Sequence, residues 1–333
     1  MSTPKTDDRS ITFGQAIREA LQEEMRRDRD VFILGEDVAE AGTPFKVLSG
    51  LVEEFGTQRV IDSPISEAGI VGIGVGAAMT GGRPVIDIMF GDFLTLTMDQ
   101  IVNQAAKIHY MSGGKWQVPM VVRTTMGATR RSAAQHSQSL HAWLSHIPGL
   151  KVVVPATPYD AKGLLKSAIR DNNPVIFFED KMMYQQKGPV PENEYLLPFG
   201  VADVKRSGRD ITLVATSSMV FVALEAAEQL ATIGIEAEVV DPRTTVPLDR
   251  RTLIESAIKT SRAIVIDEGY TSYGVTAELA AVIADGAFYY LDAPVKRLGA
   301  MDTPIPFSPA LEDLTVPTSE DVCAMAKTLC GFV

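Results

Sequence analysis

The sequence is poor in cysteine and has no long apolar run, and each shortage excludes a class of protein. Its only cysteines, Cys323 and Cys330, lie near the C-terminus, so we expect reduced thiols and no disulfide framework. No stretch reaches the roughly 20 apolar residues that a membrane helix needs. The N-terminal MSTPKTDDRS has no apolar signal core, and its acidic residues are atypical of a transit peptide. We therefore expect a cytoplasmic protein that does not bind membranes.

Basic charge is also scarce. The 31 Lys and Arg against 42 Asp and Glu give a net charge of −11, which argues against nucleic acid and suits a basic protein partner. The G-x-G-x-x-G, G-x-S-x-G and Walker A motifs are missing, so dinucleotide, hydrolase and phosphate-transfer functions have no support. His136, His141 and His146 recur every five residues, about 140° apart on a helix, which is wrong for one zinc ion. For His141 and His146 we expect structural or surface positions.

Short apolar strands alternate with helical segments along most of the chain. This alternation predicts an α/β fold with parallel sheets covered on both faces. It breaks in a Pro- and Gly-rich stretch and then restarts, so we expect one domain over residues 10–190, a linker over 191–209 and a smaller domain over 210–333. The pair Thr12 and Gln15 predicts a capping box. Recurring apolar residues before a glycine pair predict one long helix over about 94–112.

An uncharged run, AGIVGIGVGAAMTGG, begins directly after Glu67. On a helix its Gly69, Gly72, Gly76 and Thr80 share one face, because they fall three to four residues apart. A face without side chains allows another backbone to approach closely. One interpretation is a tightly packed buried helix. The other is a helix at a subunit seam, with Glu67 placed at its start for chemistry.

Polar residues follow several of the predicted strands. Ligands bind at the carboxyl ends of parallel strands, so Glu36, Phe90–Phe93 and the loop of His136 are expected to converge. Glu67 has a structural interpretation, since a carboxylate at a helix N-terminus gains about 0.3–1 kcal/mol. In the functional alternative, desolvation raises its pKa and it shares a proton with a cofactor ring nitrogen. A lone loop histidine such as His136 is more often structural than catalytic.

Longer motifs occur in a fixed order, namely PISEAGIVGIGVGAAMTGGRP, FGDF, DQIVNQAAK, YMSGG, AAQHSQSLHAW, PGLKVVVP and SAIRDNNPVIF. Together they resemble the β subunit of the thiamin-diphosphate-dependent decarboxylase component of 2-oxo-acid dehydrogenase complexes, of the pyruvate and acetoin type. The resemblance implies a parallel-sheet pyrimidine-binding domain followed by a smaller transketolase C-terminal-type α/β domain. It also implies an oxidoreductase that cleaves or decarboxylates a small 2-oxo acid or acetoin and passes the acyl group to lipoamide.

The resemblance assigns roles to individual positions. By it, Glu67 bonds the aminopyrimidine nitrogen of thiamin diphosphate and promotes the ylid, while His136 orients the substrate and takes part in acyl transfer. The implied cofactor-binding positions are Glu36, Ile65, Ser66, Glu67, Met89, Phe93 and Leu96. The implied potassium ligands are Met120, Ala168, Ile169, Asp171 and Asn173. From the local sequence alone, the Asp171–Asn173 stretch is more simply an Asx turn.

The family's diphosphate and magnesium motif, GDG followed by Asn-Asn, is missing from this sequence. The resemblance therefore implies that an α subunit holds half of the cofactor together with Mg²⁺. The expected assembly is an α2β2 heterotetramer, active only with both chains. It would dock through the C-terminal domain of β on a lipoyl acyltransferase core. The glycine face after Glu67 then becomes an expected contact with a second chain.

The stretch AAQHSQSL resembles pyruvate and acetoin subunits more than branched-chain ones. His141 and Thr125 depart from the residues expected at their positions. The alternatives are a branched-chain 2-oxo-acid subunit, a split-chain transketolase-like ketol transferase, and a scaffold subunit without activity. The presence of Glu67, Phe93 and His136 argues against the scaffold.

Overall fold

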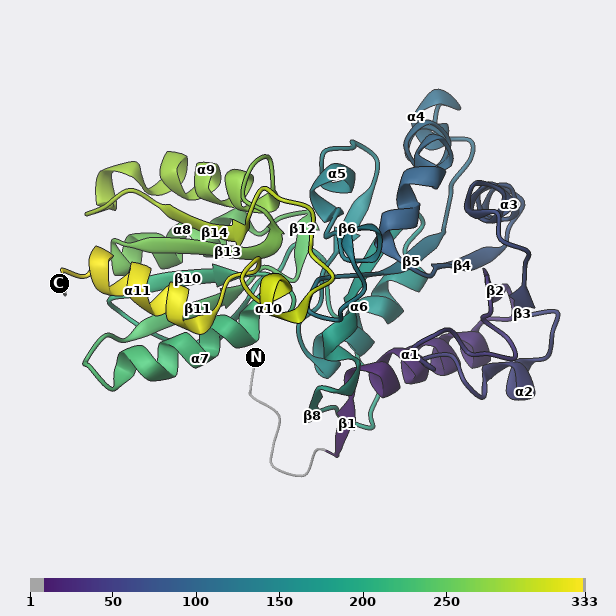
Figure 1. The fold of residues 1–333 in the computed structure, drawn as a ribbon. Coiled ribbons are helices and arrows are strands. Elements are labelled where there is room, and N and C mark those ends of the chain that lie inside the picture. Colours follow the sequence, from purple (N-terminus) through teal and green to yellow (C-terminus); the bar gives the residue numbers. More distant parts are fainter. Residues whose placement is uncertain (1–8, 332–333) are drawn as a thin grey trace. The chain divides into compact units, whose positions relative to one another are not determined.

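The computed structural model describes residues 9–331, which form two compact units (Figure 1). Unit 1 comprises the chain up to Met126 together with Trp143–Pro198, and unit 2 comprises Gly127–Ala142 together with the chain from Phe199 onward. The first expected domain includes the Gly127–Ala142 segment, whereas the contacts of this segment assign it to unit 2. The expected domain boundaries stay a prediction. The polar N-terminal tail lies outside the described residues.

Unit 1 is built on a parallel sheet whose strands follow the order β6-β7-β5-β4-β2-β3. Its strands are β2 (Val31–Gly35), β3 (Val60–Asp62), β4 (Arg83–Ile88), β5 (Val121–Met126), β6 (Lys151–Val153) and β7 (Val175–Asp180). Every residue of β5 and β7 is buried, as expected for central strands covered on both faces. The parallel order brings the carboxyl ends of these strands to one edge, where ligands bind in such sheets.

Helices cover this sheet. In Figure 1, α1 (Phe13–Arg27) and α6 (Pro158–Arg170) lie side by side on one side of β4 and β5, and α4 (Ile108–Met111) lies on the other. The capping box that begins α1 is confirmed, because Thr12 and Gln15 exchange side-chain to backbone hydrogen bonds of 2.9 and 3.1 Å. The other elements of unit 1 are β1 (Ser10–Thr12), α2 (Leu51–Phe55), α3 (Glu67–Met79), η1 (Gly91–Thr97), η2 (Asp99–Ala105), η4 (Lys181–Gln185) and β8 (Lys187–Pro189).

The uncharged run after Glu67 forms α3, a helix of 13 residues. One face packs against the sheet, and there a Cβ atom on Gly74 would lie 2.7 Å from Ile86 Cδ1. The opposite face is open: Ile73 is 59% exposed, and nothing lies within 4 Å of the Cβ position of Gly76. The buried-helix interpretation is therefore wrong within this chain. No helix among residues 9–331 is both long and apolar enough to cross a membrane.

The long helix expected over about 94–112 is interrupted. The segment runs as a 3₁₀ helix η1, a π-helical turn η2 and the short α4. Thr95 and Thr97 donate hydroxyl hydrogen bonds of 2.8 Å to the carbonyls of Asp92 and Leu94, so side chains compete with the backbone for helical partners. The expected glycine stop is confirmed, because Gly113 takes a left-handed φ of 64° at the end of α4.

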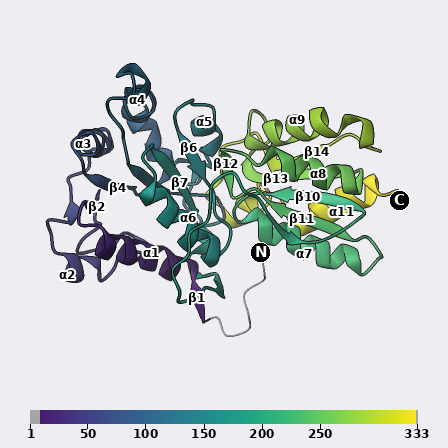
Figure 2. The ribbon, with the colours of Figure 1, turned by 180° about the vertical axis from the view of Figure 1, so that it is seen from behind.

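Unit 2 contains a second sheet in the order β14-β13-β10-β11-β9, with only β9 antiparallel to its neighbour (Figure 2). The strands of this sheet are β9 (Asp203–Arg206), β10 (Ile211–Ala215), β11 (Ala237–Asp241), β13 (Ala263–Tyr270) and β14 (Lys296–Ala300), and the short strand β12 (Thr244–Val246) of unit 2 lies outside it. The helices of unit 2 are η3 (Ala134–His136), α7 (Met219–Ala231), α8 (Arg250–Thr260), α9 (Val275–Ala287), η5 (Phe288–Tyr290), α10 (Pro309–Glu312) and α11 (Ser319–Leu329). The short helix α5 (His141–Ser145) begins where the Gly127–Ala142 segment ends.

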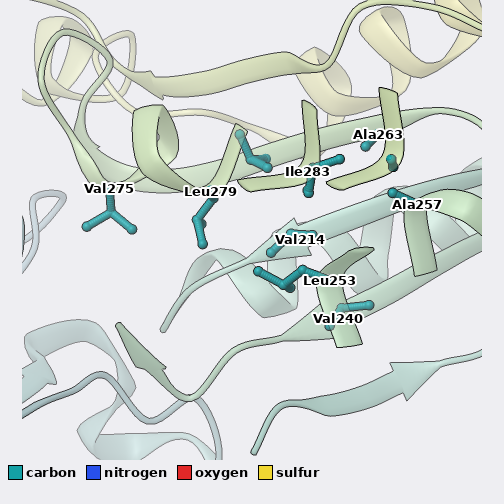
Figure 3. Close-up of a cluster of buried hydrophobic side chains, with 10 residues drawn as sticks. Val214, Val240, Leu253, Ala257, Ala263, Val275, Leu279 and Ile283 are labelled. Atoms are coloured by element: carbon teal, nitrogen blue, oxygen red, sulfur yellow. The ribbon is translucent and has the colours of Figure 1, made fainter. Parts of the chain in front are cut away.

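Aliphatic side chains hold the helices of unit 2 to its sheet. Val214 and Val240 of the sheet pack against Leu253 of α8 and Leu279 and Ile283 of α9 (Figure 3). Each of these side chains is at most 1% exposed, and burying one contributes about 1.5–3 kcal/mol. Helices α8 and α9 lie on one side of this sheet, and α7 and α11 on the other (Figure 1). The expected α/β class is confirmed for both units.

Candidate functional site

Two carboxylates meet at the carboxyl edge of the sheet of unit 1. Glu36 directly follows β2, and Glu67 is the first residue of α3. The Ser63 N–H donates a 2.9 Å hydrogen bond to the Gly35 carbonyl, so the segment leading to α3 stays beside the end of β2. Burial raises the pKa of the half-buried Glu36 carboxyl, and the charges of Asp37 and Glu67 raise it further. The pair therefore favours a proton or a donor group at this edge.

The expected wall of the site follows the neighbouring strand. Register pairs Gly35 of β2 with Asp87 of β4, so the residues after both strands leave the sheet together. The Met89 carbonyl accepts a 2.9 Å hydrogen bond from Thr125 Oγ1, which fixes the connection from β4 to η1. Phe93 in η1 is half-buried. Glu36 and the Phe90–Phe93 segment thus follow paired strands of unit 1, and their expected convergence with the loop of His136 stays a prediction.

The remaining cofactor positions are open. Ile65 is 72% exposed, Leu96 is 57% exposed, and Ser66 is exposed at the N-cap of α3, where its side chain makes no capping hydrogen bond. Large exposed apolar side chains beside a carboxylate pair are typical of a surface that a ligand or partner covers. Glu67 itself is half-buried.

His136 belongs to unit 2, at the end of the short helix η3. The backbone before it is strained, because Thr129, Arg131 and Ala133 all take left-handed φ values between 59° and 64°. For Ala133 the combination of φ 61° with ψ −178° is one that essentially only glycine adopts. Such strain persists only where the surroundings hold the chain firmly, and it clusters at functional sites.

Several links tie the His136 segment to the rest of unit 2. The Ala128 N–H donates to the Glu268 carboxylate, and Arg131 donates a 2.8 Å hydrogen bond to Glu312. His141 Nε2 lies 3.1 Å from Asp267 Oδ1, and both side chains are buried. This confirms the structural position expected for His141. Burial opposes ionisation of Asp267, but His141 and hydrogen bonds from Thr216 and Gly269 outweigh it and lower the Asp267 pKa.

Four of the implied potassium ligands, Ala168, Ile169, Asp171 and Asn173, lie where α6 ends and before β7 begins. The fifth, Met120, precedes β5, and its carbonyl accepts a 2.9 Å hydrogen bond from the Val175 N–H at the start of β7. The carbonyls of Ile169 and Asp171 accept hydrogen bonds of 3.0 and 2.8 Å from the Arg83 guanidinium. The Asp171 carboxylate accepts from Lys151 and from the Asn173 N–H, so the Asx turn is present as well. Two cationic side chains thus already face this set. Within residues 9–331, no group of three or more His, Cys, Asp or Glu residues is arranged to hold a metal ion.

Sequence reasoning missed a charged cluster inside unit 1. Arg123 of β5 donates to Glu179 of β7 through two hydrogen bonds of 2.6 and 2.8 Å, and it also pairs with Asp87 of β4. Tyr184 donates a 2.8 Å hydrogen bond to Glu179. Burial raises the pKa of Asp87 to about 6, with Arg123 opposing and Glu179 adding to the shift. The available signal was an arginine within the otherwise uncharged strand VVRTTM.

Family models match consecutive parts of the chain. The family described as transketolase, pyrimidine binding domain, matches residues 9–187, and the transketolase C-terminal domain matches residues 200–322. A solved structure named as a split gene transketolase, inactive beta4 tetramer, superposes with a TM-score of 0.77 over 97% of this chain and 99% of that chain. Its sequence is 24% identical, so this likeness shows the fold alone.

Several known proteins are similar along nearly the whole chain. The acetoin:2,6-dichlorophenolindophenol oxidoreductase subunit beta of Bacillus subtilis is 51% identical, over 97% of this chain and 98% of that protein. The pyruvate dehydrogenase E1 component subunit beta of Rhizobium meliloti is 47% identical, over 98% of this chain and 71% of that protein. The 2-oxoisovalerate dehydrogenase subunit beta of Bacillus subtilis is 46% identical, over 97% of this chain and 99% of that protein.

Proposed function

The chain belongs to the transketolase-like family of dehydrogenase β subunits, and from this premise we propose that it is the β subunit of a thiamin-diphosphate-dependent dehydrogenase. Its substrate is a small 2-oxo acid such as pyruvate, or acetoin. The observation that carries this proposal is the identity of 47–51% to acetoin and pyruvate dehydrogenase β subunits over nearly the full chain. The protein is an oxidoreductase that acts in a complex.

Unit 1 would hold the aminopyrimidine end of thiamin diphosphate, a cofactor that supplies the carbon nucleophile which adds to the substrate carbonyl. The donor set fits this group: Glu67 and Glu36 offer carboxyls to a protonatable ring nitrogen, and Phe93 offers a half-buried ring to its face. In our proposal Glu67 keeps a proton at that nitrogen through a charge-assisted hydrogen bond. Such a bond gains strength where a partner chain excludes water.

The apolar positions would enclose the cofactor ring. Ile65 and Leu96 are exposed here and would be covered on binding, and the carbonyl of Met89 is held by Thr125. Ser66 lies at the N-terminus of α3, where backbone N–H groups favour a partial negative charge on the ligand. These assignments rest on the matching positions of the resemblance and on their common edge of the sheet.

His136 would act on the substrate. A histidine beside a carbonyl oxygen that gains negative charge donates a hydrogen bond or a proton, typically contributing about 10²–10⁴-fold to the rate. The strained backbone at Ala133 and the links through Ala128, Arg131 and His141 support this role, because they hold the segment rigidly. The same residue would take part in passing the acyl group to lipoamide.

An α subunit is the partner implied by the β-subunit relatives. We propose an α2β2 heterotetramer in which α holds the diphosphate and Mg²⁺. The open part of the glycine face of α3 supports this seam, since nothing lies within 4 Å of the Cβ position of Gly76 and the nearby Ile73 is 59% exposed. Docking of the C-terminal unit on a basic domain of a lipoyl acyltransferase core is consistent with the net charge of −11. A cytoplasmic location is part of the same proposal.

Potassium at the turn after α6 is a further part of the proposal. Each carbonyl oxygen has a second lone pair, so Ile169 and Asp171 remain able to bind a cation while accepting from Arg83. The nearby positive charges of Arg83 and Lys151 oppose it. If potassium binds there, the melting temperature should be higher in KCl than in NaCl at equal ionic strength. Equal melting temperatures for the unsubstituted protein would contradict the site.

Co-purification with the α chain tests the function. The complex is expected to reduce a dye in the presence of thiamin diphosphate and either pyruvate or acetoin. Turnover of branched-chain 2-oxo acids instead would identify the branched-chain alternative, to which the similar 2-oxoisovalerate dehydrogenase subunit beta points. Transfer of a ketol group between sugar phosphates would instead identify a split-chain transketolase-like enzyme. If the complex assembles and binds its cofactor but turns over none of these substrates, the chain is a scaffold subunit without activity.

A further inference from the structure

The charged cluster of Asp87, Arg123 and Glu179 lies directly beneath the expected cofactor wall. Parallel register places Asp87 opposite Arg123, and Thr125 opposite Glu179. Side chains two residues apart on a strand point to the same face. Thr125, which follows Arg123 on that face, bonds the Met89 carbonyl at 2.9 Å. The cluster and the bond to Met89 are therefore consecutive layers on one face of the sheet.

A continuous series of aromatic rings leads from this cluster to Phe93. Tyr184, whose hydroxyl donates to Glu179 at 2.8 Å, has its ring centroid 5.1 Å from that of Phe45. The Phe45 ring lies 6.0 Å from Phe90, edge to face, and Phe90 lies 5.8 Å from Phe93, also edge to face. All these distances fall within the range in which aromatic pairs attract each other.

Phe45 also belongs to the segment that begins at Glu36. The Thr43 N–H donates a 2.8 Å hydrogen bond to the Asp37 carbonyl, which closes this segment into a compact loop. Thr43 and Lys46, on either side of Phe45, take left-handed φ values of 70° and 59°. The backbone that positions the Phe45 ring is therefore strained. The loop therefore connects a cofactor carboxylate at one end with the aromatic series at the other.

Little free space separates these groups. A cavity of only about 10 Å³ is bordered by Asp87 and Arg123, by Met89, and by Phe45 and Tyr184, although the two rings also border a separate pocket of about 240 Å³ toward the start of α1. Interiors packed this closely transmit a displacement of one side chain to the next. The buried ion pairs themselves are a poor way to gain stability, since apolar residues of similar volume often do as well. Their location below the cofactor wall offers a different reason for their presence.

We propose that Phe45 and Tyr184 are positioning residues for the cofactor-binding ring of Phe93, and that the Arg123–Glu179 ion pair is the rigid base beneath them. Tyr184 is fixed by Glu179 and supports Phe45; Phe45 supports Phe90; and Phe90 sets the tilt of Phe93. The inference rests on the proposed function, because that function assigns Phe93 to the cofactor. The inference extends the proposed function, because it names side chains that influence the cofactor without touching it, through the rings that lie between.

Phe45→Leu in the co-expressed complex of α and β tests the proposal. The thiamin diphosphate concentration for half-saturation is expected to rise about tenfold, because Phe93 loses its support. With saturating cofactor, kcat should fall and the circular dichroism of the bound cofactor should change, while the substrate KM stays within twofold. Phe45→Tyr keeps the ring and should restore all three. Phe55→Leu is the matched control. The Phe55 ring lies in another part of unit 1, where its centroid is 5.3 Å from Cζ of the Arg59 guanidinium.

The outcomes separate this inference from the proposed function. A wild-type complex that binds no thiamin diphosphate would overturn both. Wild-type binding together with unchanged cofactor affinity and dichroism in Phe45→Leu would overturn only the positioning role, as would an equal effect of Phe55→Leu. Tyr184→Phe provides a second, milder variant, since it removes only the hydroxyl that Glu179 accepts. This variant should weaken cofactor binding about threefold. If its cofactor binding is unchanged, Tyr184 and the Arg123–Glu179 ion pair have no part in positioning Phe93.

Discussion

Replacing Gly76 by alanine should strengthen the isolated chain and weaken its assembly with α. Gly76 lies at the start of the last turn of α3, and nothing occupies the space within 4 Å of its Cβ position. Alanine at such a site gains about 0.5–1 kcal/mol of helix propensity over glycine. If a helix of α packs closely against this face, the added methyl group instead separates the two backbones. Overpacking of this kind costs about 1–3 kcal/mol, or roughly 5- to 150-fold in affinity.

Gly74→Ala is the matched control on the opposite face of the same helix. Its Cβ atom would lie 2.7 Å from Ile86 Cδ1 and 2.9 Å from Met120 Sδ, so the overpacking falls within the chain itself and should lower its stability by about 1–2 kcal/mol. Urea unfolding of β alone and titration of β with α by calorimetry measure the two quantities. Unaltered affinity of Gly76→Ala for α would refute the seam, and a less stable isolated Gly76→Ala chain would refute the open face.

The remaining predictions concern single side chains. Glu67→Gln should leave the heterotetramer assembled but slow hydrogen exchange at the thiazolium carbon of bound cofactor by orders of magnitude; exchange at the wild-type rate, followed by NMR, would contradict its role. His136→Ala should lower turnover or lipoyl acylation by about 10²–10⁴-fold with unchanged cofactor affinity, and full activity would return this histidine to a structural role. His141→Ala leaves Asp267 buried without its imidazole partner and should cost about 3–5 kcal/mol. Because the Asp267 pKa is lowered on folding, its contribution is present above the unfolded pKa of about 3.9 and is lost as the pH falls through the folded pKa. The stability gained by wild type between pH 3 and pH 6 should therefore shrink in His141→Ala, and an identical pH dependence would contradict the pairing.

Periodicity and capping signals were sufficient for the architecture. Alternating strands and helices predicted the α/β class, and Thr12 with Gln15 predicted the start of α1. These features depend on residues near one another in the sequence. The interruption of the helix over about 94–112 depends on them only in part. The hydroxyl hydrogen bonds of Thr95 and Thr97 are local, but Gly91 also approaches the carbonyl of the distant Thr125 closely.

Only part of the candidate site could be predicted from the sequence. That Glu36 and the Phe90–Phe93 segment follow strands of one parallel sheet was predictable from the order of elements. The pairing of Arg123 with Glu179 joins residues from strands far apart in the sequence, and no local pattern reports it. His141 had no expected partner, because Asp267 lies more than a hundred residues further along the chain.

Turnover by the assembled complex tests the central claim most directly. The β chain should be co-expressed with its α chain, purified, loaded with thiamin diphosphate and assayed for dye reduction with pyruvate, acetoin and branched 2-oxo acids. We predict turnover of pyruvate or acetoin that requires both chains and disappears in Glu67→Gln. A well-assembled, cofactor-loaded complex that turns over none of these substrates, or that is equally active with glutamine at position 67, would contradict the proposed function.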